Sequence, residues 1–266
     1  MKAYIEIIRN SFLTGITYRV NTLLRIFGAV VSLLVQISLW YVLFQSKPDA
    51  TSHIGAIKLS EMVTYTIVST LTHIIISNQV IMRLDNKIKT GQIAMDLIKP
   101  MSLKAILGSE MIGTTLYNVI FRSLPILLIG IFLFSFQFSG WLNLAFFIIA
   151  LFNAAVIFFE LSYIVGLTGF WYTTVWHMGR VLDNAIRVFG GSFIPLWFFP
   201  ESLYHISMFL PFRFIYYTPI LIYIGKVDMK GVIEIILQQW VWIAILIIIE
   251  KVIWKFGIKK LVIQGG

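Results

Sequence analysis

Six apolar runs, separated by polar or charged stretches, form the dominant pattern of the chain. A transmembrane helix needs about 20 apolar residues, and each run is close to that length. Because hydrocarbon offers the backbone no hydrogen-bond partner, such runs cross a membrane as helices. The predicted spans cover residues 23–44, 62–82, 112–134, 141–167, 181–198 and 232–254.

The stretch before the first span, residues 1–20, shows helical periodicity instead of a continuous apolar run. Its apolar positions are Ile5, Ile8, Phe12 and Ile16, and the other face carries Lys2, Glu6 and Arg9. This pattern predicts an amphipathic helix that lies in the membrane interface. The alternative is a solvated N-terminus without regular structure.

The segment between the last two spans, residues 195–226, is apolar but is interrupted by Pro200, Pro211 and Pro219. We interpret it as a re-entrant or surface helical hairpin on the outer face, because broken backbone at membrane depth must be covered by protein or water. A seventh crossing would export the basic C-terminal tail. With six crossings and both termini in the cytoplasm, most of the 21 lysines and arginines lie on the cytoplasmic side, in keeping with the positive-inside rule.

Composition supports this topology. Hydrophobic residues make up 59% of the 266 residues, charged residues make up 12%, and the mean hydropathy is +0.88. A soluble domain carries far more polar surface. We therefore predict an all-α membrane protein with six transmembrane helices in one domain, residues 1–266. The net charge of +9 follows from the topology, so we expect no nucleic-acid partner.

Motifs for catalysis and metal binding are missing from the sequence. There is no GxxxxGK[ST] phosphate loop and no HExxH helix, the four histidines are scattered, and there is no cysteine. Each of these motifs is needed for its chemistry because the spacing places the reacting groups together. We therefore expect no enzymatic activity, no metal site and no cofactor bound by this chain itself.

Four patches of sequence resemble one known family. They are Thr90-Gly91-Gln92-Ile93-Ala94 with Asp96-Leu97-Ile98-Lys99-Pro100, Gly190-Gly191 with Ile194-Pro195-Leu196-Trp197-Phe198-Phe199-Pro200, Leu210-Pro211-Phe212 with Tyr217-Thr218-Pro219, and Gln264-Gly265-Gly266. These patches are similar to those of ABC type-2 (ABC-2) transporter permeases, in the branch of daunorubicin- and viologen-type exporters. One departure is Lys99, where the pattern favours an arginine and its bidentate contact.

The resemblance implies the permease subunit of an ATP-driven exporter, which we expect in the bacterial cytoplasmic membrane. Such permeases act as homodimers or heterodimers, and each recruits a cytoplasmic ABC ATPase subunit that binds ATP and Mg. Their cargo is hydrophobic or amphipathic, such as a drug, a peptide or a lipid-like molecule. The alternative is a secondary transporter that works without an ATPase. That reading predicts two repeats with matching broken helices, and only one broken segment is present here.

Residues 83–104 are the predicted coupling segment, with Leu84, Ile88, Met95 and Ile98 near one helical face. A short helix of this kind seats in a groove of a partner protein. The alternative is a basic loop held to anionic lipid. The residues that the resemblance assigns to ATPase coupling are Lys89, Gly91, Gln92, Asp96, Leu97, Lys99 and Pro100.

Two further sets of residues are functional candidates. The predicted outer gate consists of Pro195, Trp197, Phe198, Phe199, Pro200, Pro211 and Phe212, for which an interfacial aromatic belt is the alternative. Arg122 and Glu160 lie within predicted spans, where charges are costly and mark functional sites. Pairing with each other is one way in which both charges would be satisfied.

Overall fold

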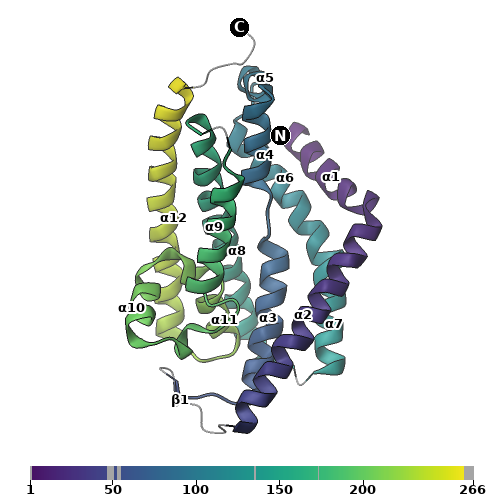
Figure 1. Cartoon of the computed structure of the whole chain (residues 1–266), viewed down its shortest axis with the longest axis vertical. Coiled ribbons are helices and arrows are strands. Elements are labelled where there is room, and N and C mark those ends of the chain that lie inside the picture. The colour runs from purple at the N-terminus through teal and green to yellow at the C-terminus, as the bar shows by residue number, and fades with distance from the viewer. Residues whose placement is uncertain (1, 47–50, 53–54, 135, 173, 261–266) are drawn as a thin grey trace.

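The computed structural model describes residues 2–46, 51–52, 55–134, 136–172 and 174–260, and these form a bundle of helices (Figure 1). The helices are α1 (Lys2–Thr17), α2 (Arg19–Ser46), α3 (Leu59–Ile76), α4 (Val80–Lys89), α5 (Gln92–Ile98), α6 (Leu103–Asn118), α7 (Leu124–Leu133), α8 (Trp141–Leu167), α9 (Trp176–Phe189), α10 (Glu201–Phe209), α11 (Tyr217–Tyr223) and α12 (Met229–Gly257). A π-helical turn, Val119–Ser123, joins α6 to α7. Two short strands, β1 (Thr51–Ser52) and β2 (Gly55–Ala56), pair antiparallel.

Five stretches of the described chain are long and apolar enough to cross a membrane. They are Arg19–Gln45, Leu59–Lys89, Leu103–Leu133, Trp141–Phe170 and Met229–Lys260. These stretches coincide with five of the six predicted spans, and the helical membrane fold is confirmed. The second stretch contains a break at residues 77–79, where the chain leaves α3 before it enters α4.

The predicted fifth span, residues 181–198, needs a correction. Helix α9 has only 14 residues and ends at Phe189, and 14 helical residues extend about 21 Å, short of the roughly 30 Å hydrocarbon core. The chain turns at Gly191, whose φ of +74° suits glycine. A Cβ atom on Gly190 would collide with the backbone oxygen of Phe212. Hydropathy registers an apolar run but not this tight turn within it.

The chain beyond α9 folds back in the lower half of the bundle in Figure 1. Residues Glu201–Phe209 and Pro211–Tyr223 form a helical pair that is bent by 74°, as the re-entrant interpretation predicted. The start of α1 and the end of α12 both lie in the upper part of Figure 1, together with α5. We call this end of the molecule the α5 end. The described chain has six crossings when the bent pair counts as one span.

Helix α8 lies at the centre and packs against α4, α11 and α12. Buried amides join these elements: Asn153 of α8 donates to Gln239 of α12 over 3.0 Å. Gln239 in turn donates to the backbone oxygens of Ala150 and Phe214. Because each buried polar group has a partner, these residues hold the last span against the centre without an unsatisfied donor.

Helix α1 packs closely on α6 through two glycines. A Cβ atom on Gly113 of α6 would collide with the backbone oxygen of Ile8, and one on Gly15 of α1 would meet the ring of Tyr117. No residue of α1 is fully buried, so one face contacts α6 while the other stays exposed. The predicted position of residues 1–20 in the membrane interface stays a prediction.

Replacing Gly113 with alanine tests this close approach. We expect Gly113→Ala to lower the free energy of unfolding by about 1–3 kcal/mol, because the added methyl group must displace backbone. Thermal unfolding of the detergent-purified protein measures the effect. The control is Gly108→Ala in the same helix, where a Cβ atom meets Phe159 at 3.8 Å, an ordinary contact. An equal unfolding temperature for the two variants would contradict the packing.

Candidate functional site

Helices α4 and α5 form an elbow at the tip of the α5 end (Figure 1). They are joined by Thr90 and Gly91, and Gly91 has a φ of +70°, a left-handed conformation that glycine adopts without strain. The predicted coupling segment is therefore two short helices at an angle and not one continuous helix. This geometry separates the four apolar residues that were expected on one face.

Most apolar residues of α4 point inward, and Met82 is the exposed exception among them. Leu84 is fully buried, and a Cβ atom on Gly166 of α8 would lie only 2.9 Å from its side chain. Ile88 approaches Gly169 in the same way. In contrast, Met95 and Ile98 of α5 are 64% and 80% exposed. Leu84 and Ile88 thus anchor α4 to the bundle, and Met95 and Ile98 are exposed at the tip of the elbow.

Asp96 holds α5 in place. Its side chain is buried, with 1% of the residue exposed, and it accepts hydrogen bonds from Lys87 over 2.6 Å and Lys99 over 2.7 Å. Burial alone would raise the pKa of Asp96, but the hydrogen bonds and charges of Lys87 and Lys99 outweigh burial and lower the pKa below its usual value. Asp96 is therefore ionised at neutral pH.

Asp85 connects the elbow to the start of α9. Its carboxylate accepts from Lys89 over 2.5 Å and from the backbone N–H of Val175 over 3.4 Å. Ile81 of α4 also packs against Gly179 of α9, where a Cβ atom would lie 3.2 Å away. Asp85 and Ile81 thus join α4 to α9, and the bent helical pair follows α9 along the chain.

A buried cluster of three charges joins the spans beside the elbow. Lys104 at the start of α6 contacts Glu160 of α8 at 2.7 Å and Glu250 of α12 at 3.2 Å. Its ammonium group also lies 5.8 Å from the ring centre of Tyr163. Glu160 and Arg122 do not pair with each other, since Arg122 donates to Asn118 over 3.0 Å. Glu160 is thus paired with a lysine, whereas Arg122 contacts only the neutral amide of Asn118 within the described residues.

A family model described as ABC-2 family transporter protein matches residues 30–265. The chain belongs to the ABC-2 transporter family. A search of curated proteins finds no match. Of the four patches that carried the resemblance, Gln264-Gly265-Gly266 lies outside the described residues.

The predicted coupling residues of this ABC-2 permease divide into exposed and buried sets. Lys89, Gln92, Lys99 and Pro100 are exposed, Gly91 and Leu97 are partly exposed, and Asp96 is buried. Sequence reasoning missed Lys87, Asp85, Lys104 and Glu250 as partners. Glu250 could have been found by the argument that singled out Glu160, because it is also a carboxylate in an apolar span.

The outer hairpin of the permease packs on α2 and α3. Trp197 is buried edge-on against Tyr65, with ring centres 4.9 Å apart, and Phe198 stacks on Trp40. The Tyr65 hydroxyl donates to the backbone oxygen of Gly191 over 2.6 Å. Of the other predicted gate residues, Pro195 and Pro211 are buried, Phe199 and Phe212 are partly buried, and Pro200 is exposed. Their role as a gate stays a prediction.

Asp96→Asn is expected to release α5 from the elbow. The amide leaves Lys87 and Lys99 without a carboxylate, which costs about 1–3 kcal/mol of local stability. Hydrogen exchange of the amides in residues 92–98 should therefore quicken, while that of α12 stays the same. Glu234→Gln, at an exposed carboxylate, is the control. Unchanged exchange in residues 92–98 of Asp96→Asn would contradict the anchoring role.

Lys104→Met tests the buried charge cluster. It leaves Glu160 and Glu250 facing each other without a cation, so we expect the free energy of unfolding to fall by about 3–5 kcal/mol. Glu250→Gln keeps the pair between Lys104 and Glu160 and should cost less. Thermal unfolding compares both with Lys251→Met, at an exposed neighbour. If Lys104→Met and Lys251→Met unfold at the same temperature, the charge cluster does not contribute to the stability of the fold.

Proposed function

We propose that this chain is the permease subunit of an ATP-driven exporter and that the elbow of α4 and α5 is its contact with a cytoplasmic ABC ATPase subunit. Membership of the ABC-2 family establishes a membrane transport component. The finer proposal rests on one observation: α5 exposes Met95 and Ile98 at the tip of the molecule and is held rigid by the buried Asp96. A rigid short helix with exposed apolar side chains can bind in a groove on a partner protein.

The proposed coupling path runs from the elbow to the outer hairpin. ATP-driven closure of the ATPase subunits moves α5, Asp96 and Lys87 carry the movement to α4, and Asp85 carries it to Val175 and α9. Gly190 follows the last residue of α9, and its backbone oxygen accepts from the N–H of Tyr217 in the hairpin over 3.0 Å. Movement of the elbow at the cytoplasmic end is in this way coupled to movement of the predicted outer gate.

The cargo, the partners and the orientation belong to the same proposal. We propose two permease subunits, a hydrophobic or amphipathic cargo, and an orientation with the α5 end in the cytoplasm. The orientation is supported by Lys87, Lys89, Lys99 and Lys104, which cluster at that end, as the positive-inside rule favours. The daunorubicin- and viologen-type branch stays a prediction.

A pull-down tests the proposal. We expect the tagged chain, extracted in mild detergent from its native membrane, to recover a cytoplasmic ATPase subunit and ATP hydrolysis. The double substitution Met95→Glu with Ile98→Glu should reduce recovered ATPase activity at least about tenfold, since two apolar contacts of roughly 1 kcal/mol or more are replaced by charges. Both side chains are exposed, so folding should be unaffected.

The matched control is Met229→Glu, which places the same charge on an exposed methionine of α12 far from the elbow. Its recovered ATPase activity should equal that of the wild type. Recovery of the wild-type chain alone, without ATP hydrolysis, would overturn the proposal in favour of a secondary transporter. Equal loss in Met229→Glu would show that the elbow is not the contact.

A further inference from the structure

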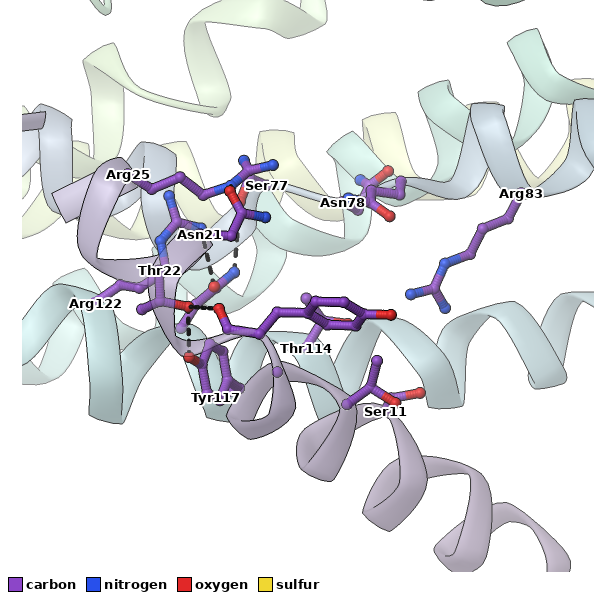
Figure 2. A pocket seen from close by; sticks show the side chains of 15 residues that line it. Ser11, Asn21, Thr22, Arg25, Ser77, Asn78, Arg83, Thr114, Tyr117 and Arg122 are labelled. Carbon is purple, nitrogen blue, oxygen red and sulfur yellow. Dashed lines mark hydrogen bonds between the residues drawn. The ribbon is translucent and has the colours of Figure 1, made fainter. Parts of the chain in front are cut away.

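A polar pocket of about 410 Å³ lies beside the broken span, between α1, α2 and α6 (Figure 2). Its walls are completed by residues 77–79, at the break between α3 and α4. The neighbouring helices also present polar side chains to the pocket, among them Thr14, Asn21 and Asn118. A pocket of this kind inside a membrane bundle needs polar contents.

The charge of this pocket is strongly one-sided. Arg25, Arg83 and Arg122 line it, and its lining contains no aspartate or glutamate. Figure 2 shows Arg25 and Arg122 near one end and Arg83 at the other. Arg83 is neutralised by an ion pair with Glu110, which lies outside the lining. The remaining two guanidinium groups give the pocket a net positive charge.

Arg25 and Arg122 have only neutral partners within the described part of the chain. Arg25 donates to the side-chain oxygen of Asn21 over 3.3 Å, and Arg122 donates to that of Asn118. The Nε of Arg122 and the side-chain nitrogen of Asn78 are buried without a hydrogen-bond partner. Buried donors without an acceptor are rare and costly. Both point to an acceptor that the chain itself does not supply.

Apolar surface adjoins the arginines. The ring of Phe121 stacks on that of Tyr117 in the pocket wall, with ring centres 5.0 Å apart, and Phe121 is exposed. Phe12 of α1 packs edge-on against the same tyrosine. The amphipathic α1 forms another wall of the pocket, so the pocket lies where charged and apolar surfaces of the bundle meet. A phosphate group binds guanidinium groups bidentately, while acyl chains cover exposed apolar residues.

We propose that this pocket binds the phosphate headgroup of an anionic amphiphile whose chains lie against Phe121 and Phe12. The phosphate oxygens accept from Arg25, from Arg122 and from the unpaired donor of Asn78. The same headgroup chemistry belongs to a resident membrane lipid and to a transported amphiphile. Binding requires neither an ATPase subunit nor transport, so this proposal can fail while the permease proposal stands, and the reverse.

Native mass spectrometry of the detergent-purified full chain tests the proposal with two probes. Phosphatidylglycerol and phosphatidylcholine with identical acyl chains are each added to the protein. We expect the wild type to retain phosphatidylglycerol preferentially and Arg25→Gln with Arg122→Gln to lose this retention at least about tenfold, since hydrogen bonds to charged groups are strong. Arg19→Gln, on the same helix as Arg25 but outside the pocket, should behave like the wild type.

Two further variants separate loss of binding from loss of folding. Arg25→Gln alone changes an exposed side chain and should reduce retention without lowering the unfolding temperature. Arg122→Lys keeps the charge but loses the bidentate contact, so its retention should lie between wild type and double variant. Equal retention of phosphatidylglycerol by wild type and double variant would overturn the proposal. If the pocket bound inorganic phosphate as tightly as phosphatidylglycerol, the acyl chains would contribute nothing, and the proposal that the ligand is an amphiphile would be overturned.

The source of the headgroup is distinguished in vesicles that carry the permease with its recovered ATPase subunit. ATP-dependent movement of fluorescent phosphatidylglycerol between leaflets, abolished by the double variant, would support the site and assign it to cargo. Retention without such movement would support the site and assign it to a resident lipid.

Discussion

A charge inside an apolar bundle is tolerated only where other groups satisfy it, because an unpaired buried ion costs several kcal/mol. Lys104 meets this constraint at the point where three spans converge, with Glu160 on one side and Glu250 on the other. Its position fixes the depth of α6 relative to α8 and α12. Residues 99–102 join α5 to the start of α6, so the position of the exposed face of α5 depends on the same cluster.

The constraint also explains why the elbow is rigid. Asp96 lies in the interior of the elbow and not on its surface, and it binds one lysine from α4 and one from just beyond α5. A flexible loop with the same charges would present Asp96 to a partner directly. Here Asp96 acts as a positioning residue, and Met95 and Ile98 of α5 remain exposed as the proposed contact surface.

The sequence was sufficient to predict the long spans, because a continuous apolar run of adequate length has few structural alternatives in a membrane. It was insufficient for the fifth span, where residues 190–191 break an apolar run that hydropathy reads as continuous. Glu160 was recognisable as a candidate, but its partner Lys104 precedes it by 56 residues, and only the packing of α6 on α8 brings them together. Asp96 was identified by resemblance, whereas its burial depends on the angle at Gly91.

Helix α4 connects the two proposed sites. Arg83 near its start lines the cationic pocket, and Asp85, Lys87 and Lys89 on its following turns belong to the elbow. In the two proposals, this ten-residue helix has one end at the anion pocket and the other at the ATPase contact. Because Arg83 pairs with Glu110, α4 is joined to α6 at the pocket wall. We therefore expect ligand binding in the pocket and subunit contact at α5 to be energetically linked.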